Sequence, residues 1–286
     1  MSRIAVLGSV NMDLVTRAPR IPAVGETVLG ESLAEIPGGK GANQAKAAAR
    51  LGGEVWFLGA LGADRFAGTL RESLEQAGVH LPEARAVDAA SGLAAISVDH
   101  AGDNAIIVVP GANAAMTALL PEERRRIVEC DVLLMQCELP ISIVTEAAMA
   151  ASAAGATVML NPSPARELPS DLASSTDVLI VNEHEAAVLH ADLRHVRHVV
   201  TTRGGAGASY RGPGGGEIET APPAVDVVDT TGAGDAFAGA LAAFWHTGPR
   251  TALRWATAAG AVATTRPGAF APPLTLVAEY VEHDEV

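Results

Sequence analysis

The feature that most constrains the fold is an alternation between short apolar runs and helix-forming segments along most of the chain. Runs typical of buried strands lie at residues 4–7, 55–61, 131–135, 157–160, 177–181 and 198–202. Segments of helical character lie at residues 39–53, 64–76, 141–154, 235–246 and 251–264. Aromatic residues make up only 3% of the chain, so alanine, valine and leucine must fill its core. Strands that alternate with helices predict an α/β fold with a parallel sheet covered on both faces.

Two β-prone runs, 93–98 and 104–109, interrupt this alternation. A turn-rich segment separates them, so the pair predicts a hairpin. Such a hairpin suggests a small sheet that stands off the main body, and the β-prone stretch at 27–33 is a candidate further strand. We therefore expect a small β-sheet lid contributed by residues of about 12–37 and 92–110.

A second hairpin is expected at 208–211 and 216–221, around a cluster of glycines. The sequence contains no internal repeat and no polar linker longer than a few residues. One domain over residues 1–286, with the lid as its appendage, is the simplest interpretation.

The net charge of −13 disfavours nucleic acid and membrane surfaces as partners, because an acidic chain repels phosphate groups. The two cysteines, Cys130 and Cys137, are spaced unlike a redox pair or a zinc knuckle, so we expect buried, reduced thiols. The apolar start of the chain is too short for a signal peptide, and no run approaches the length of a membrane span. These features favour a cytoplasmic protein.

The segment VDTTGAGDAFAG at residues 228–239 is the most informative for chemistry. Glycines at 232 and 234 allow successive N–H groups to point one way, and a helix beginning near Asp235 adds its positive end. This predicts an anion hole beside a carboxylate, which suits removal of a proton from a hydroxyl that attacks a phosphoryl group. The alternative is an Asp N-cap after a glycine turn. Phe237 breaks the dinucleotide fingerprint, and no P-loop is present.

A second glycine-rich segment, PGGKGANQ at residues 37–44, precedes a helix. Lys40 and Asn43 offer donors of the kind that a sugar requires, although an ordinary glycine-rich helix start explains the pattern equally well. Asn11 and Asp13 follow the first strand, where open α/β sheets bind ligands; an Asx turn is the alternative.

The segment NEHE follows the strand at 177–181. Asn182 and Glu185 are three residues apart on the first turn of a helix and can share a hydrated Mg²⁺. A helix-capping arrangement is the alternative. His184 is not part of an H-E-x-x-H pattern, so zinc is unsupported.

Taken together, these segments resemble the ribokinase/PfkB carbohydrate kinase family over nearly the whole chain. The segments in the family's order are GSVNMD, PAVGET, GGKGANQA, PGANA, LMQCELP, LNPSPARELP, NEHEA, TTRGGAG, VDTTGAGDAFAGA and RPGA. The resemblance implies a doubly wound α/β domain with a small β-lid that closes over the sugar and often forms a dimer contact. It also implies a kinase that uses ATP, Mg²⁺ and an activating K⁺ to phosphorylate the primary hydroxyl of a pentose, foremost D-ribose.

The resemblance assigns roles to individual positions. The catalytic group is Asp235 as base, with Gly232, Ala233 and Gly234 as the anion hole. The sugar-binding positions are Asn11, Met12, Asp13, Gly39, Lys40, Gly41, Ala42, Asn43, Glu138 and Asp235. The nucleotide positions are Asn182, Glu185, Thr202, Arg203, Gly204, Gly205, Ala206, Gly207, Gly234 and Thr257. The positions that hold the monovalent cation are Asp229, Thr231, Ala263, Arg266 and Gly268.

One region departs from the family pattern. The segment at residues 186–198 is markedly shorter than the corresponding segment of the family, so the resemblance implies nucleotide binding less strongly than sugar binding. The alternatives are a related kinase for deoxyribose, fructose or a nucleoside, an inactive sugar-binding regulator, and a dehydrogenase. The intact Asp235 segment disfavours the regulator, and the missing fingerprint disfavours the dehydrogenase.

Overall fold

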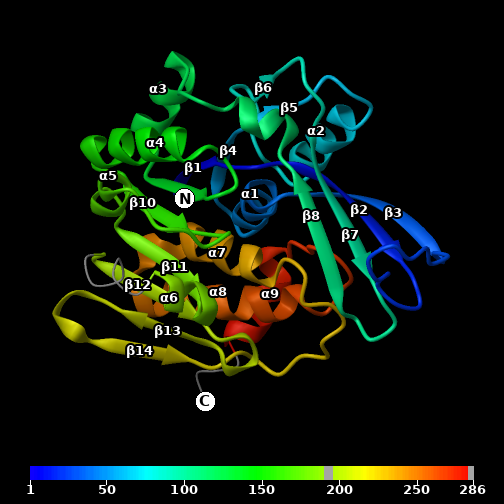
Figure 1. Ribbon diagram of the computed structural model, residues 1–286. Helices are drawn as coiled ribbons and strands as arrows, with labels where there is room; N and C mark the ends of the chain where they lie inside the picture. The colour runs from blue at the N-terminus through cyan, green and yellow to red at the C-terminus, as the bar shows by residue number, and fades with distance from the viewer. Residues whose placement is uncertain (190–195, 283–286) are drawn as a thin grey trace.

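The short apolar runs form one large sheet in the computed structural model, which describes residues 1–189 and 196–282. Its strands, in the order in which they lie side by side, are β14 (Glu217–Thr220), β13 (Ala208–Arg211), β12 (His198–Thr202), β11 (Val178–Asn182), β10 (Thr157–Asn161), β9 (Val132–Gln136), β1 (Arg3–Leu7) and β4 (Glu54–Leu58). The strands from β12 to β4 are parallel, and the hairpin β13–β14 adds an antiparallel edge. The mainly parallel sheet and the second hairpin are therefore confirmed (Figure 1).

Helices cover both faces of this sheet. On one face lie α1 (Lys40–Arg50), α2 (Ala67–Glu75), α7 (Ala233–Phe244), α8 (Pro249–Ala263) and α9 (Leu274–Glu282). On the other lie α3 (Pro121–Glu129), α4 (Ile141–Ala154), α5 (Ser170–Ser174) and α6 (Glu183–Val188). None of the helices within the described ranges is long and apolar enough to cross a membrane. The doubly wound fold is confirmed.

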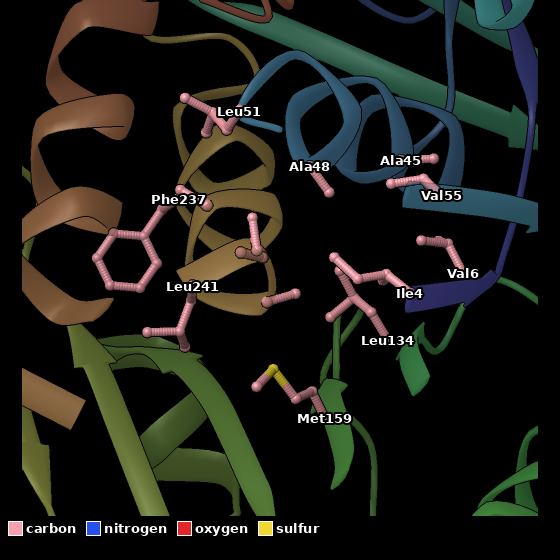
Figure 2. Close-up of a cluster of buried hydrophobic side chains, with 14 of the residues drawn as sticks. Ile4, Val6, Ala45, Ala48, Leu51, Val55, Leu134, Met159, Phe237 and Leu241 are labelled. Atoms are coloured by element: carbon pink, nitrogen blue, oxygen red, sulfur yellow. The ribbon is translucent and has the colours of Figure 1, made fainter. Parts of the chain in front are cut away.

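Alternate residues of the central strands supply two separate cores. Ile4 and Val6 of β1 pack in the first core, whereas Ala5 and Leu7 pack in the second. A period of two is the spacing at which strand side chains change face. Figure 2 shows part of the first core, where residues of the sheet, α1 and α7 meet. This packing fixes α1 and α7 side by side over the sheet.

A smaller sheet stands off the main body (Figure 1). Its order is β3 (Ser32–Gly38), β2 (Asn11–Arg17), β7 (Gly92–Val98) and β8 (Asn104–Val109). The hairpin expected at 93–109 is confirmed as β7–β8. The strand expected at 27–33 was placed too early: β3 pairs with β2 along its whole length, from Asn11 opposite Gly38 to Arg17 opposite Ser32. That pairing ends the strand at the glycines before α1.

Several smaller features complete the chain. A two-stranded sheet joins β5 (Ala60–Leu61) to β6 (Arg85–Ala86). Short 3₁₀ turns lie at Gly111–Ala115, Gly204–Ala206, Pro213–Gly215 and Trp245–Thr247. Cys130 and Cys137 are both unpaired and buried, as expected. The shortened region at 186–198 falls partly outside the described residues.

Candidate active site

The first turn of α7 carries the carboxylate that the sequence singled out. Gly232 is the N-cap in the left-handed conformation, with φ of 75°, and the helix begins at Ala233. A Cβ at position 232 would lie 2.7 Å from the Cα of Ala269, so only glycine fits there. Asp235 therefore lies inside the first turn, and the alternative that it caps the helix is wrong because Gly232 occupies that position.

This helix start also leaves N–H groups available. The N–H of Ala233 donates to Thr230 O at 3.2 Å, and the N–H of Ala236 donates to Gly232 O at 2.9 Å. The two N–H groups between them, of Gly234 and Asp235, have no backbone acceptor in the part of the chain that the structure describes. Because the positive end of the helix dipole adds to them, this turn favours an anion.

Two amides on α1 hold the Asp235 carboxylate. Asn43 Nδ2 donates to Oδ2 at 3.1 Å, and Gln44 Nε2 donates to Oδ1 at 3.0 Å. Burial raises the pKa of Asp235, and the charge of Lys40 and the two amide donors oppose that rise. Asn43 Oδ1 is buried without a hydrogen-bond partner, so it remains able to accept a hydrogen bond from a hydroxyl group of a ligand.

Two further carboxylates face the same region. Burial, reinforced by the charge of Glu138, raises the pKa of Asp13 to about 6, while the charge of Lys46 opposes the rise. Glu138 follows β9 and accepts hydrogen bonds from Ser9 Oγ at 2.5 Å and from the Lys40 N–H at 3.3 Å. Three carboxylates within electrostatic reach of one another suit a neutral, hydroxyl-rich ligand better than an anionic one.

Close backbone approach brings β1 and α1 together at this edge. A Cβ at Gly41 would lie 2.6 Å from backbone atoms of Gly8 and Ser9. Asn11 is buried, and its Oδ1 accepts a hydrogen bond from Asn113 Nδ2 at 2.8 Å. One edge of the sheet therefore brings together the carboxyl ends of β1 and β9 and the start of α1. Open α/β sheets bind their ligands at this edge.

A cavity of about 500 Å³ lies on the other side of the α7 start. Its lining is mainly apolar and comprises Thr202, Gly204, Gly205, Gly207, Pro222, Pro223, Ala224, Val225, Val227, Thr230, Ala233, Gly234, Phe237, Thr257, Gly260, Ala261 and Thr264. Thr257 Oγ1 is buried without a partner, which marks a position for a polar ligand atom. The volume is in the range of cofactor pockets. Ala233 and Gly234 thus line this cavity, while the next residue, Asp235, faces the amides of α1.

Comparison with known proteins decides the family. The family model described as pfkB family carbohydrate kinase matches residues 1–275. The chain belongs to the pfkB family of carbohydrate kinases. It is 37% identical over 279 residues to the ribokinase of Bacillus subtilis (strain 168), covering 94% of this chain and 95% of that protein. It is 36% identical over 253 residues to the ribokinase of Lactococcus lactis subsp. lactis (strain IL1403), covering 85% and 83%.

A solved structure shares the whole architecture of this kinase. The ribokinase of Arabidopsis thaliana, solved as a complex with ribose and ATP, superposes with a TM-score of 0.91 at 30% identity. The match covers 98% of this chain and 99% of that one.

The residues that the sequence assigned to the nucleotide divide into two groups in this carbohydrate kinase. Thr202, Gly204, Gly205, Gly207, Gly234 and Thr257 line the cavity, whereas Asn182, Glu185, Arg203 and Ala206 do not. Asn182 and Glu185 form a reciprocal capping box on α6, since Asn182 Oδ1 accepts from the Glu185 N–H and Glu185 Oε2 from the Asn182 N–H. The capping alternative is therefore observed, and a Mg²⁺ role stays a prediction.

The assigned sugar and cation positions also differ in their surroundings. The side chains of Met12 and Ala42 are buried in the first core, so only their backbone can reach a ligand. Asp229 joins the two loops of the predicted cation site: Oδ1 accepts the Thr231 N–H at 2.9 Å and Oδ2 the Gly268 N–H at 2.8 Å. Ala263 is buried. The guanidinium carbon of Arg266 lies 4.5 Å from the centre of the Phe270 ring, over its face.

Sequence reasoning missed several residues of this site. They are Ser9, Gln44, Asn113, Gln136 and Asn161, together with the cavity wall formed by Pro222, Pro223, Ala224, Val225 and Val227. A signal for two of them was present, because Gln136 and Asn161 are polar residues that end strands with apolar residues directly before them. Polar residues at the carboxyl ends of neighbouring parallel strands meet at one edge of the sheet.

Proposed function

We propose that this kinase transfers the γ-phosphoryl group of ATP to the primary hydroxyl of D-ribose, giving ribose 5-phosphate and ADP. The observation that carries the proposal is the position of Asp235, between the 500 Å³ cavity and the cluster of amides and carboxylates. ATP would occupy the cavity, with its γ-phosphate at the start of α7. The sugar would lie among Asn11, Asp13 and Asn43.

In this arrangement Asp235 accepts the proton of the attacking hydroxyl as its oxygen forms the new bond to phosphorus. The bond between the γ-phosphorus and the bridging oxygen breaks, and ADP leaves with that electron pair. The N–H groups of Gly234 and Asp235 stabilise charge on the phosphoryl oxygens. A base whose pKa is raised by burial, as that of Asp235 is, lies closer to neutrality and is better suited to this task.

Two cations would assist. The described residues hold no group of three His, Cys, Asp or Glu side chains placed for a metal, so Mg²⁺ would be held mainly by ATP and water, with Asn182 and Glu185 nearby. It would neutralise charge on the phosphates. For K⁺, the two loops that Asp229 joins would supply backbone carbonyls near Thr231 and Gly268. Burial raises the pKa of Asp229, but hydrogen bonds from Thr231 and Gly268 outweigh burial and lower this pKa.

Release of ADP, coupled to a reporter reaction, tests the proposal across ribose, deoxyribose, fructose and a nucleoside, each with and without K⁺. We expect the highest kcat/KM with ribose, a higher kcat with K⁺ present, and ribose 5-phosphate as the product. Greater kcat/KM with another sugar would reassign the substrate. No sugar-dependent ADP release would favour the sugar-binding regulator.

We further propose that the kinase forms a homodimer through the small sheet. Every residue of β8 is exposed, including Ile106, Ile107, Val108 and Val109, and Leu33 of β3 is exposed as well. A contiguous apolar strand of this kind marks an interface, and a second copy of the chain could cover it. Ile107→Asp should shift the sedimentation coefficient from dimer to monomer, whereas Val24→Asp, at an exposed position outside the sheet, should not. A monomeric parent protein would contradict the proposal.

The state of the two cysteines supports a proposal for the compartment. Burial raises the pKa of Cys130 and of Cys137 to about 11, and neither is paired. Because free buried thiols are typical of reducing surroundings, we propose a cytoplasmic location.

A further inference from the structure

A chain of buried amides lies behind Asp235. Gln44 Nε2 donates to Asp235 Oδ1 at 3.0 Å and to Asn161 Oδ1 at 3.1 Å. Gln44 Oε1 accepts from Gln136 Nε2 at 2.7 Å. Gln44 and Gln136 are both 0% exposed, so neither is available to touch the sugar or the nucleotide from solvent. Every polar atom of the Gln44 side chain is thereby engaged within the protein.

The direction of the hydrogen bond between Gln44 and Asn161 is set by the backbone of a neighbouring strand. Asn161 ends β10, and its Nδ2 donates to Ile180 O of β11 at 2.9 Å. This bond requires Asn161 to turn its oxygen toward α1. Only the amide nitrogen of Gln44 can donate to that oxygen, and Gln136 donates to the opposite side of the same amide. Gln44 therefore presents a donor, never an acceptor, to Asp235.

Close contact between α1 and α7 holds this geometry. A Cβ at Gly239, one helical turn after Asp235, would lie 2.6 Å from Gln44 O and 2.7 Å from Ala47 Cβ. The absence of a side chain at position 239 lets the two helices approach until Gln44 reaches the carboxylate. The backbone at Gln44 and the carboxylate of Asp235 are thus fixed with respect to each other.

We propose that Gln44 is a positioning residue for the base, and that Asn161 and Gln136 set the orientation of its amide. The relay stabilises the ionised form of Asp235 against the effect of burial and holds Oδ1. The other oxygen, Oδ2, is the one next to Asn43 and takes the hydroxyl proton. This inference rests on the proposed role of Asp235, and it adds a purpose for side chains that do not contact either substrate.

Gln44→Glu tests the relay with little change in shape. The introduced carboxylate keeps an acceptor for Gln136 but places an oxygen against Asp235 Oδ1 and Asn161 Oδ1. We expect the acid limb of the kcat profile to move up by about one pH unit, because two close carboxylates cannot both ionise freely; kcat should therefore fall about tenfold at pH values below that limb. At high pH kcat should partly recover. KM for ribose and for ATP should stay within about twofold, since no substrate contact is removed.

The matched control is Glu123→Gln, the reverse exchange at another fully buried position. Glu123 pairs with Arg85 at 2.6 Å and lies on α3, on the opposite face of the sheet. We expect this variant to lose thermal stability while kcat and its pH profile stay unchanged. If Gln44→Glu behaves in the same way, Gln44 is only structural and the proposal fails. A rise in KM for ribose alone would also contradict it.

Two further variants separate the possible failures. Asn161→Leu removes the group that orients Gln44 and should shift the pH profile in the same direction, which keeps the test decisive if Gln44→Glu does not fold. Asp235→Asn is measured alongside. If it retains normal kcat, the base assignment itself fails; if it is inactive while both relay variants match the parent profile, only the relay is wrong.

Discussion

Gly232 and Gly234 stand two residues apart in the same turn, yet they should respond to alanine in opposite ways. At Gly232, φ is 75° and a Cβ would lie 2.7 Å from Ala269. The left-handed conformation costs alanine about 1–2 kcal/mol, and the overlap adds about 1–3 kcal/mol. A loss of about 2–5 kcal/mol corresponds to a fall in Tm of about 4–10 °C in a chain of this size.

At Gly234 the backbone is helical, and a Cβ would meet no protein atom within 4 Å. Alanine there should leave stability unchanged or raise it by up to about 1 kcal/mol. The methyl group would instead project where Gly234 lines the cavity proposed for ATP, next to the Gly234 N–H group. Because the methyl group would keep the phosphoryl group away from that N–H donor, and a lost donor to the transition state is costly, kcat should fall at least about tenfold.

Differential scanning calorimetry and steady-state ADP release on the two variants measure both effects. Gly232→Ala should be thermally weakened, whereas Gly234→Ala should keep its Tm and lose kcat. Full activity in Gly234→Ala would refute the placement of the phosphoryl group at this turn. An unchanged Tm in Gly232→Ala would refute the strain argument.

Two further predictions concern substrate binding. Burial raises the pKa of Asp13 to about 6, so its carboxylate is fully ionised only above that pH, and KM for ribose should rise as the pH falls through 6. Asp13→Asn should abolish this pH dependence and keep KM for ribose high. Because the variant lacks a buried charge, its Tm at pH 8 should be higher than that of the parent protein. Thr257 Oγ1 is buried and unpartnered in the cavity, so Thr257→Val should raise KM for ATP about two- to tenfold while Tm stays the same or increases. A flat ribose KM between pH 5 and 8, or an unaltered ATP KM, would contradict these statements.

The main sheet was predictable because its strands are buried on both faces. Such strands appear as continuous apolar runs, and β9 (Val132–Gln136) and β12 (His198–Thr202) were found within a residue of their ends. Strands with one exposed face were harder to recognise. β3 is exposed over most of its length, and the adjacent β2 was not recognised as a strand. Their pairing register, set between distant residues, is not visible in local composition.

Two surface helices, α3 and α9, were not predicted from the sequence for a related reason. α3 is charged along most of its length and buries only Glu123 and Ile127, so it lacks the apolar stripe on which periodicity depends. α9 was missed entirely, although Val277 reaches the first core. In both cases the packing partner, rather than the segment itself, decides the structure.

The site showed a similar division. Asp235 was found from its glycine turn, but its place inside the helix, rather than at the cap, follows from the helix beginning at Ala233 with Gly232 as its N-cap. Gln44 lies within a segment that was already singled out, yet its importance rests on three partners from three other elements. Local sequence identifies residues whose side chains could take part in the chemistry, and the fold decides which of them lie close together.

The most direct test of the central claim is a single-turnover experiment with Asp235→Asn, in which transfer of the labelled γ-phosphoryl group to ribose is followed beside calorimetric binding of ATP and ribose. If the carboxylate takes the hydroxyl proton, both ligands bind within about threefold of the parent affinity while transfer slows by about 10²–10⁴-fold. Transfer at the parent rate by the folded variant would show that another group, or none, performs this step.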